Sequence, residues 1–324
     1  MPFPEGFGLR PPRPADAEPI VAMLNAETEA FIGVPIAGID WVANMWTAPS
    51  ADVESDFAVV HTDAGDLAGY LLVQGHPPYT EVFAVGVVAL PYHGRGLGAA
   101  IIAETERRAG RLADLAPPRR RVVMHAGALA DEPRISALLS EHGYVEVRRL
   151  SQMQIDFAGP PATPATVPGV EIRPLLRGEE RAVYTCLAEA FDDDWSEGFP
   201  SEEDWIHQHV DAVDSYQPEL WWLAWAGSQL AGALVGIPRA DENSSLGYVG
   251  LLGVRRAFRG RGIAEALLRT SFVRFHDLGR HGVCLHVDTE SVTGATRLYE
   301  RVGMTIHPRF ATWEKELRSG LAAE

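Results

Sequence analysis

The sequence contains little cysteine and no long apolar run. Its two cysteines, Cys186 and Cys284, show no metal-ligand spacing, so we expect two buried thiols and no metal site. No stretch of about 18 apolar residues occurs, which argues against a membrane partner. The N-terminus lacks the apolar core of a signal peptide, and we therefore expect a cytoplasmic protein.

Positive charge is also scarce. Lys315 is the only lysine, and 28 lysine and arginine residues stand against 44 aspartate and glutamate residues, which gives a formal net charge of −16. A general nucleic-acid binder needs a basic face that displaces counterions. The composition therefore predicts no nucleic-acid partner.

Several short motifs occur twice, in the same order. The pairs are Leu9-Arg10-Pro11 with Ile172-Arg173-Pro174, Leu67-Ala68-Gly69 with Leu230-Ala231-Gly232, the glycine loops around Gly96 and Gly262, and the later glycines Gly143 and Gly303. Their separations are 163, 163, 166 and 160 positions. A separation that stays nearly constant over four landmarks indicates a duplicated unit.

Length and composition fit two domains. A chain of 324 residues is long for one core, whereas halves of about 150 residues match the commonest domain size. The segment AGPPATPATVPG between the halves consists of proline and small residues, which is typical of an extended linker. We expect domains at 1–158 and 170–324, joined by a proline-rich linker at 159–169.

Both halves show the same order of predicted elements. In the first half we expect strands at 57–61, 67–74, 82–89, 121–126 and 150–157, and helices at 97–112 and 133–141. In the second half we expect strands at 170–174, 220–225, 229–237, 247–254, 282–287 and 310–317, helices at 179–191, 263–278 and 294–301, and a further helix capped by Ser201. This order predicts an α+β fold. Each half forms a mixed, mostly antiparallel sheet flanked by helices, and its own last strand completes that sheet.

In each half a glycine loop follows a strand and opens a helix. The unpaired N–H groups at a helix N-terminus bind anions, and glycine lets a phosphate approach the backbone closely. The loop at 259–264 does not have the spacing of a dinucleotide fold, and it lacks the lysine of a Walker loop. The loop therefore indicates a phosphate site of another class.

Two motifs of the second half together resemble the GNAT superfamily of N-acetyltransferases, in its tandem, two-domain form. They are Leu252-Gly253-Val254 followed by Arg259-Gly260-Arg261-Gly262-Ile263-Ala264, and Gly294-Ala295-Thr296-Arg297-Leu298-Tyr299-Glu300-Arg301-Val302-Gly303-Met304. The resemblance spans 9–157 and 170–317. It implies two tandem GNAT-like domains and an enzyme that transfers an acetyl group from acetyl-CoA to the primary amine of a small molecule by direct attack.

The resemblance also assigns the coenzyme contacts. It places the pyrophosphate on the glycine loop, and the pantetheine and acetyl carbonyl on the backbone of the preceding strand, which splays apart from the next strand. The residues expected to bind acetyl-CoA are Leu252, Gly253, Val254, Arg259, Gly260, Arg261, Gly262, Ile263 and Ala264.

Tyr299 matches the tyrosine that many family members use as a general acid toward the coenzyme sulfur. The alternative is a tyrosine that only fills the interface between helix and sheet. The general base is open, because Tyr248 stands on the strand where related tandem enzymes often have a glutamate. The carboxylates that could act through a water are Asp288 and Glu242, our first candidates, with Asp241 and Glu290.

The first copy departs from the second at an informative place. Leu139 stands where Tyr299 stands, and a leucine cannot protonate a thiolate. We therefore expect the second half to be catalytic and the first half to be non-catalytic. The first glycine loop survives, so this half either binds a second coenzyme or only shapes the substrate cleft. The second candidate cofactor site consists of Val88, His93, Gly94, Arg95, Gly96, Leu97 and Gly98.

The sequence does not identify the acceptor amine. Asp192-Asp193-Asp194-Trp195 could attract a cationic amine, although a solvated acidic turn has the same composition. Mycothiol synthase-like members of the superfamily acetylate a cysteinyl sugar and share the tandem length, but the strand glutamate is missing here; an aminoglycoside-type acetyltransferase is another alternative. A non-catalytic acyl-CoA-binding sensor is the alternative from a different class, and the presence of Tyr299 argues against it. We expect a monomer or a homodimer.

Overall fold

The computed structural model describes residues 2–130, 132–192, 199–211, 216–240, 243–288 and 295–320. These residues divide into two compact units. Those of the first lie mainly within Met1–Arg149 and Arg309–Glu324, and those of the second lie mainly within Leu150–Trp195 and Phe199–Pro308. None of the described helices is both long enough and apolar enough to cross a bilayer.

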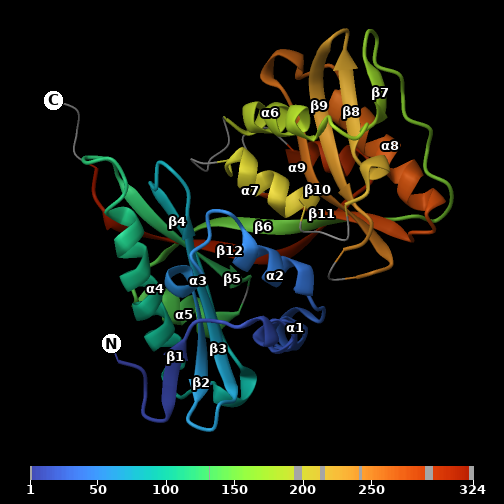
Figure 1. The fold of residues 1–324 in the computed structure, drawn as a ribbon. Helices are drawn as coiled ribbons and strands as arrows, with labels where there is room; N and C mark the ends of the chain where they lie inside the picture. The colour runs from blue at the N-terminus through green and yellow to red at the C-terminus, as the bar shows by residue number, and fades with distance from the viewer. Residues whose placement is uncertain are drawn as a thin grey trace. The chain divides into compact units, whose positions relative to one another are not determined.

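The first unit is a mixed sheet with helices on it (Figure 1). Its strands, in spatial order, are β1 (Phe7–Arg10), β2 (Phe57–Thr62), β3 (Leu67–Gly75), β4 (Glu81–Val88), β5 (Val122–Leu129) and β12 (Thr305–Arg318). Only the pairing of β4 with β5 is parallel. The helical segments are η1 (Pro14–Asp16), α1 (Ala17–Ile32), α2 (Ile39–Thr47), α3 (Val53–Asp56), η2 (Leu90–Tyr92), α4 (Leu97–Ala113) and α5 (Pro133–Glu141).

The second unit repeats this plan. Its strands, in spatial order, are β6 (Val145–Asp156), β11 (Gly282–Asp288), β10 (Leu246–Val254), β9 (Gln229–Ile237), β8 (Trp222–Ala226) and β7 (Glu171–Pro174). Only the pairing of β10 with β11 is parallel. The helical segments are α6 (Glu180–Phe191), α7 (Glu202–Ile206), η3 (His207–Asp211), η4 (Pro218–Leu220), η5 (Arg256–Phe258), α8 (Ile263–Asp277) and α9 (Ala295–Arg301). The α+β class and the mostly antiparallel sheets are thus as predicted.

The last strand of each half pairs differently from our expectation. We expected 150–157 to complete the first sheet and 310–317 to complete the second. Instead, β6 pairs with β11, with Met153 opposite Leu285, and β12 pairs with β5, with Trp313 opposite Ala126. Both strands are antiparallel to their partners and bury apolar side chains, so their own sequence patterns suit either sheet.

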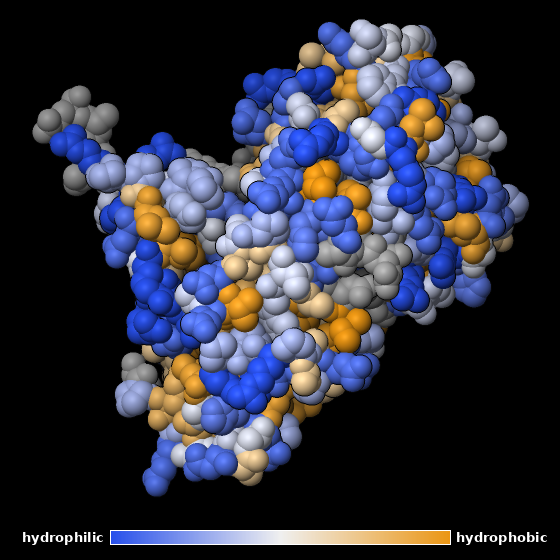
Figure 2. Space-filling model, viewed as in Figure 1, coloured by the Kyte–Doolittle hydropathy of each residue, from blue (hydrophilic) through white to orange (hydrophobic). Residues whose placement is uncertain are grey.

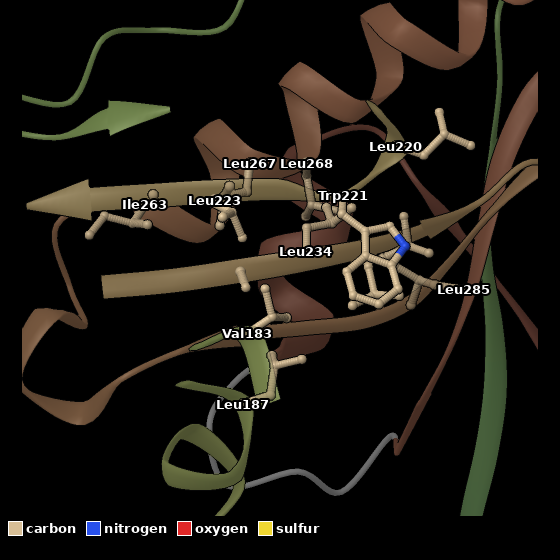
Figure 3. Packing of buried hydrophobic residues seen from close by; sticks show 14 of the residues in the cluster. Val183, Leu187, Leu220, Trp221, Leu223, Leu234, Ile263, Leu267, Leu268 and Leu285 are labelled. Atoms are coloured by element: carbon tan, nitrogen blue, oxygen red, sulfur yellow. The ribbon is translucent and has the colours of Figure 1, made fainter. Parts of the chain in front are cut away.

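Helices cover both faces of the second sheet. A Cβ atom added at Gly253 would meet Leu187 and Ala190 of α6, whereas one added at Gly247 would overlap the ring of Phe275 in α8. Figure 3 shows side chains of α6, such as Leu187, on one side of the strands and side chains of α8 on the other. The glycine loop that starts α8 is therefore anchored to a packed core.

Two local features agree with the sequence. Cys186 and Cys284 are buried free thiols. Ser201 caps α7, because its Oγ accepts a hydrogen bond from the backbone N–H of Asp204 at 3.1 Å. On the face drawn in Figure 2, hydrophobic residues form separate small areas among hydrophilic ones.

We predict that Gly247→Ala destabilises the protein by about 1–3 kcal/mol, because the new methyl group must displace the fully buried ring of Phe275. The matched control is Gly127→Ala on β5, where the part of the chain that the structure describes has no heavy atom within 4 Å of the Cβ position beyond the chain neighbours. Urea unfolding of both variants is the measurement. Equal stability of the two variants would show that the helix does not pack tightly on Gly247.

Candidate functional site

The parallel strands β10 and β11 separate part of the way along. Their pairing ends where Tyr248 lies opposite Cys284, yet β10 continues to Val254 and β11 continues to Asp288. Beyond that point the facing edges of the two strands are not joined to each other. This geometry matches the splayed strands that the family resemblance implies.

A bulge and the strand alternation direct backbone groups of β10 into this opening. The register against β9 shifts between Val249 and Leu251, which leaves Gly250 as the extra residue. Just after the strand, the N–H of Arg255 donates to Ala231 O on the β9 side at 2.9 Å. Because successive residues point to opposite edges, the N–H and C=O groups of Leu252 and Val254 point away from β9. A ligand in the opening can reach the N–H and C=O of Leu252 and the N–H of Val254, whereas Val254 O accepts a hydrogen bond from Nε of Arg259 at 3.1 Å.

The loop that follows β10 offers a second set of backbone donors. Gly260 and Gly262 have φ angles of 75° and 81°, in the left-handed region that glycine adopts without strain. Gly262 is the N-cap of α8, and a glycine has no side chain with which to cap this end. Apart from the glycine itself and its chain neighbours, no heavy atom of the described residues lies within 4 Å of the Cβ position at either glycine. The loop therefore has the shape and the free donors that a phosphate needs.

The two arginines of this loop have different surroundings. Arg259 turns inward: its Nε donates to Val254 O at 3.1 Å, and its Nη2 donates to Ala190 O at 2.7 Å. It joins the loop to the ends of β10 and α6. Arg261 is exposed, and its guanidinium lies 5.8 Å from the centroid of the Phe258 ring. Of the two, Arg261 is better placed to meet a dissolved anion.

Tyr299 lies in the core of the second unit. It is 8% exposed and belongs to the same cluster as Ile263, the first residue of α8, and Val287, near the end of β11. Among the described residues none forms a hydrogen bond with its hydroxyl. Burial raises the pKa of Tyr299 to about 12, so the phenol keeps its proton at neutral pH.

The first unit contains a similar opening and a similar loop. The parallel pairing of β4 with β5 ends where Ala84 lies opposite Ala126. Gly94 and Gly96 have φ angles of 74° and 80°, and Gly96 is the uncapped N-cap of α4. The Cβ position at Gly96 lies 3.7 Å from Pro4 Cγ, so this loop is partly covered by the chain's own N-terminal segment.

The position of Arg259 is taken by a histidine in the first unit. The Nε2 atom of His93 lies 2.9 Å from Val88 O and 2.8 Å from an oxygen of Glu27. Burial raises the pKa of the Glu27 carboxyl. Leu139, the counterpart of Tyr299, is buried in an apolar cluster. This unit thus keeps the backbone loop and offers no hydroxyl at Leu139.

Three of the four candidate bases, Glu242, Asp241 and Glu290, lie outside the described residues, and so does the acidic segment 193–195. Asp288 pairs with Leu150 through its backbone, and its side chain is not described.

A polar contact that the sequence analysis did not anticipate lies nearby. The hydroxyl of Tyr248 is 3.1 Å from Nδ1 of His286. The sequence contained one signal for this contact. His286 follows Cys284 by two residues on the predicted strand 282–287, and side chains two residues apart on a strand lie on the same face.

The comparisons with known proteins agree with this geometry. The model of the acetyltransferase (GNAT) family matches residues 183–304. A mycothiol acetyltransferase from Geodermatophilus obscurus is 29% identical over 311 residues, which cover 93% of this chain and 95% of that protein. The tandem GNAT protein from the clavulanic acid biosynthesis pathway has a TM-score of 0.67 and 16% sequence identity, and the match covers 96% of this chain and 99% of that protein. At this identity the match supports the fold alone.

Similarity in both sequence and fold is found with a solved structure of the same family. The GCN5-related N-acetyltransferase from Sphaerobacter thermophilus is 32% identical to this chain, has a TM-score of 0.78, and is matched over 99% of both chains. With the family-model match and the splayed strands, this similarity identifies the chain as a tandem member of the GNAT family of N-acetyltransferases.

Proposed function

We propose that the protein transfers an acetyl group from acetyl-CoA to the primary amine of a small molecule, and that its second half does so. The observation that carries the proposal is the opening between β10 and β11, which lies beside an uncapped helix N-terminus. The edge of β10 in this opening offers backbone N–H and C=O groups, and the N-terminus of α8 offers N–H groups for a phosphate.

The residues of this chain fit acetyl-CoA. The loop N–H groups and Arg261 would hold the pyrophosphate, while the backbone of Leu252 and Val254 would hold the pantetheine and the acetyl carbonyl. Arg259 would act by fixing the loop, because its guanidinium already bonds to two carbonyls. The full proposed set is Leu252, Gly253, Val254, Arg259, Gly260, Arg261, Gly262, Ile263 and Ala264. When bound, acetyl-CoA supplies a thioester carbonyl that an amine can attack.

Tyr299 is the proposed general acid. The amine lone pair forms the new C–N bond, the C–S bond breaks with its electron pair going to sulfur, and Tyr299 donates its phenolic proton to that sulfur. The nitrogen loses a proton to a base, and Tyr299 regains one from solvent. A buried phenol that keeps its proton suits this role. Leu139 cannot perform it, which is why we assign catalysis to the second half.

The first half provides a second candidate cofactor site. It consists of Val88, His93, Gly94, Arg95, Gly96, Leu97 and Gly98. The uncapped start of α4 supports anion binding here, whereas Pro4 beside Gly96 narrows the space in front of the loop.

A cysteinyl sugar is the first candidate acceptor to test, through its primary amine. The relatives named mycothiol acetyltransferase, at 29% identity and below, favour it. Tyr248 in place of the strand glutamate counts against a simple transfer of their chemistry. The acceptor is therefore best found with a panel that includes the cysteinyl sugar, glucosamine and cysteine, with release of free thiol from acetyl-CoA as the signal.

We predict that Tyr299→Phe lowers kcat by roughly 100-fold on the best acceptor of that panel, because the leaving thiolate loses its proton donor. The matched control in the first half is Leu139→Met, which conserves volume and should leave kcat unchanged. Thiol release measures both. Unchanged turnover of Tyr299→Phe would contradict the assignment of the acid.

We predict that Gly262→Ala weakens acetyl-CoA binding by at least tenfold, because its methyl group occupies the space of the phosphate. The control is Gly279→Ala at the other end of α8, where φ is 75° and the Cβ position is equally open. Both variants carry the same backbone strain of about 1 kcal/mol. Titration calorimetry measures the affinity, and its stoichiometry shows whether the first loop also fills. Equal affinity of the two variants would contradict the phosphate site.

We predict that the ionisation of Tyr299 is absent near pH 10, where an unperturbed tyrosine titrates, and that it occurs near pH 12. Because the pKa is raised in the folded state, the stability that this phenol contributes below pH 10 is lost as the pH rises through 12. NMR of ¹³C-labelled tyrosine follows the titration, and Tyr299→Phe assigns the resonance. Titration near pH 10 would mean that the phenol faces water.

A further inference from the structure

Tyr248 and His286 form a pair of polar side chains at the start of the opening. The Tyr248 hydroxyl lies 3.1 Å from Nδ1 of His286, and the ring centroids are 5.7 Å apart. Both side chains are half-buried. A neutral imidazole accepts a hydrogen bond at one ring nitrogen, so the phenol can donate to Nδ1 at this distance.

The strand register fixes where this pair lies. Tyr248 is in the last paired position of β10, opposite Cys284, and His286 is two residues further along β11, where the strands have separated. Side chains alternate between faces, so His286 shares a face with Cys284 and Tyr248. Gly247 faces Phe275 of α8. The pair therefore lies on the opposite face, at the inner end of the opening.

The corresponding ring pair of the first unit lacks a hydroxyl. Phe83 lies opposite His125 on the parallel strands β4 and β5, as Tyr248 lies opposite Cys284 on β10 and β11, and the ring centroids of Phe83 and His125 are 5.3 Å apart. A phenylalanine cannot donate a hydrogen bond to the imidazole. Among the described residues, the contact between a phenol hydroxyl and an imidazole at this point of the sheet therefore occurs in the half that also carries Tyr299.

We propose that Tyr248 and His286 together take the proton that the acceptor amine must lose, an inference that rests on the proposed function. The ammonium group of the acceptor gives a proton to the Tyr248 oxygen as the Tyr248 hydroxyl gives its proton to Nδ1 of His286. The products are a neutral amine, an intact phenol and an imidazolium. The amine then holds the lone pair that forms the C–N bond, and the imidazolium returns its proton to solvent.

Related tandem enzymes often have a glutamate on this strand. In this chain the relay removes the proton from the acceptor amine in place of that glutamate. Tyr248 is the catalytic residue, because its oxygen meets the amine. His286 is a positioning and proton-accepting residue that acts through Tyr248. A histidine is suited to this work because a neutral imidazole has one ring nitrogen that accepts a proton.

The test measures thiol release from acetyl-CoA with the cysteinyl sugar, glucosamine and cysteine as acceptors. Tyr248→Phe, which gives the second half the residue that the first half has at Phe83, should lower kcat by roughly 100-fold. His286→Ala should lower kcat to a similar extent, and imidazole added to the buffer should restore part of the activity. The KM for acetyl-CoA should stay unchanged in both. Tyr144→Phe, which removes a buried hydroxyl from the first unit, is the control.

Each possible result either supports or contradicts the relay. Full activity of Tyr248→Phe, or an imidazole-insensitive loss in His286→Ala, would overturn the relay while the proposed function stands. Loss of activity in Glu242→Gln or Asp288→Asn with Tyr248→Phe unimpaired would assign the base to a carboxylate instead. Absence of thiol release by the unaltered protein would overturn the proposed function and the relay with it. Calorimetric binding of acetyl-CoA and unfolding curves show that each variant is folded.

Discussion

The parallel pairing of β10 with β11 ends at Tyr248 and Cys284, and the rest of the site depends on that ending. Strands that stayed paired would use up the backbone groups of Leu252 and Val254 in ladder hydrogen bonds. The bulge at Gly250 turns β10 at this point, and α6 and α8 pack on its two faces. Packing therefore holds an opening whose edges are polar backbone, next to the helix end that suits a phosphate.

The two halves keep the same backbone device and differ in side chains. Each has separating parallel strands and an uncapped helix that starts at a left-handed glycine. The two phenol hydroxyls to which we assign proton transfer, those of Tyr299 and Tyr248, occur in the second half, whereas the first half has Leu139 and Phe83 at these positions. Duplication thus accounts for the fold, and these two positions account for the proposed division of labour.

The features that local sequence determines were predictable. A strand, a glycine loop and a helix follow one another in the order that the pattern at 247–278 indicates, and Ser201 caps a helix as its neighbours suggest. The exchange of β6 and β12 was not predictable, because an amphipathic strand carries no mark of which of two related sheet edges it will join. The inward turn of Arg259 and the contact of Tyr248 with His286 depend on neighbours remote in sequence, so composition and spacing could not reveal them.

The central claim is that acetyl-CoA lies between β10 and β11 with its phosphates at the start of α8. The most direct measurement is the change in backbone amide resonances when acetyl-CoA is added to the isotopically labelled protein. The account predicts that the amides of Leu252, Val254, Ile263 and Ala264 shift together and saturate at one concentration. Shifts confined to other parts of the chain, with these four amides unchanged, would contradict it.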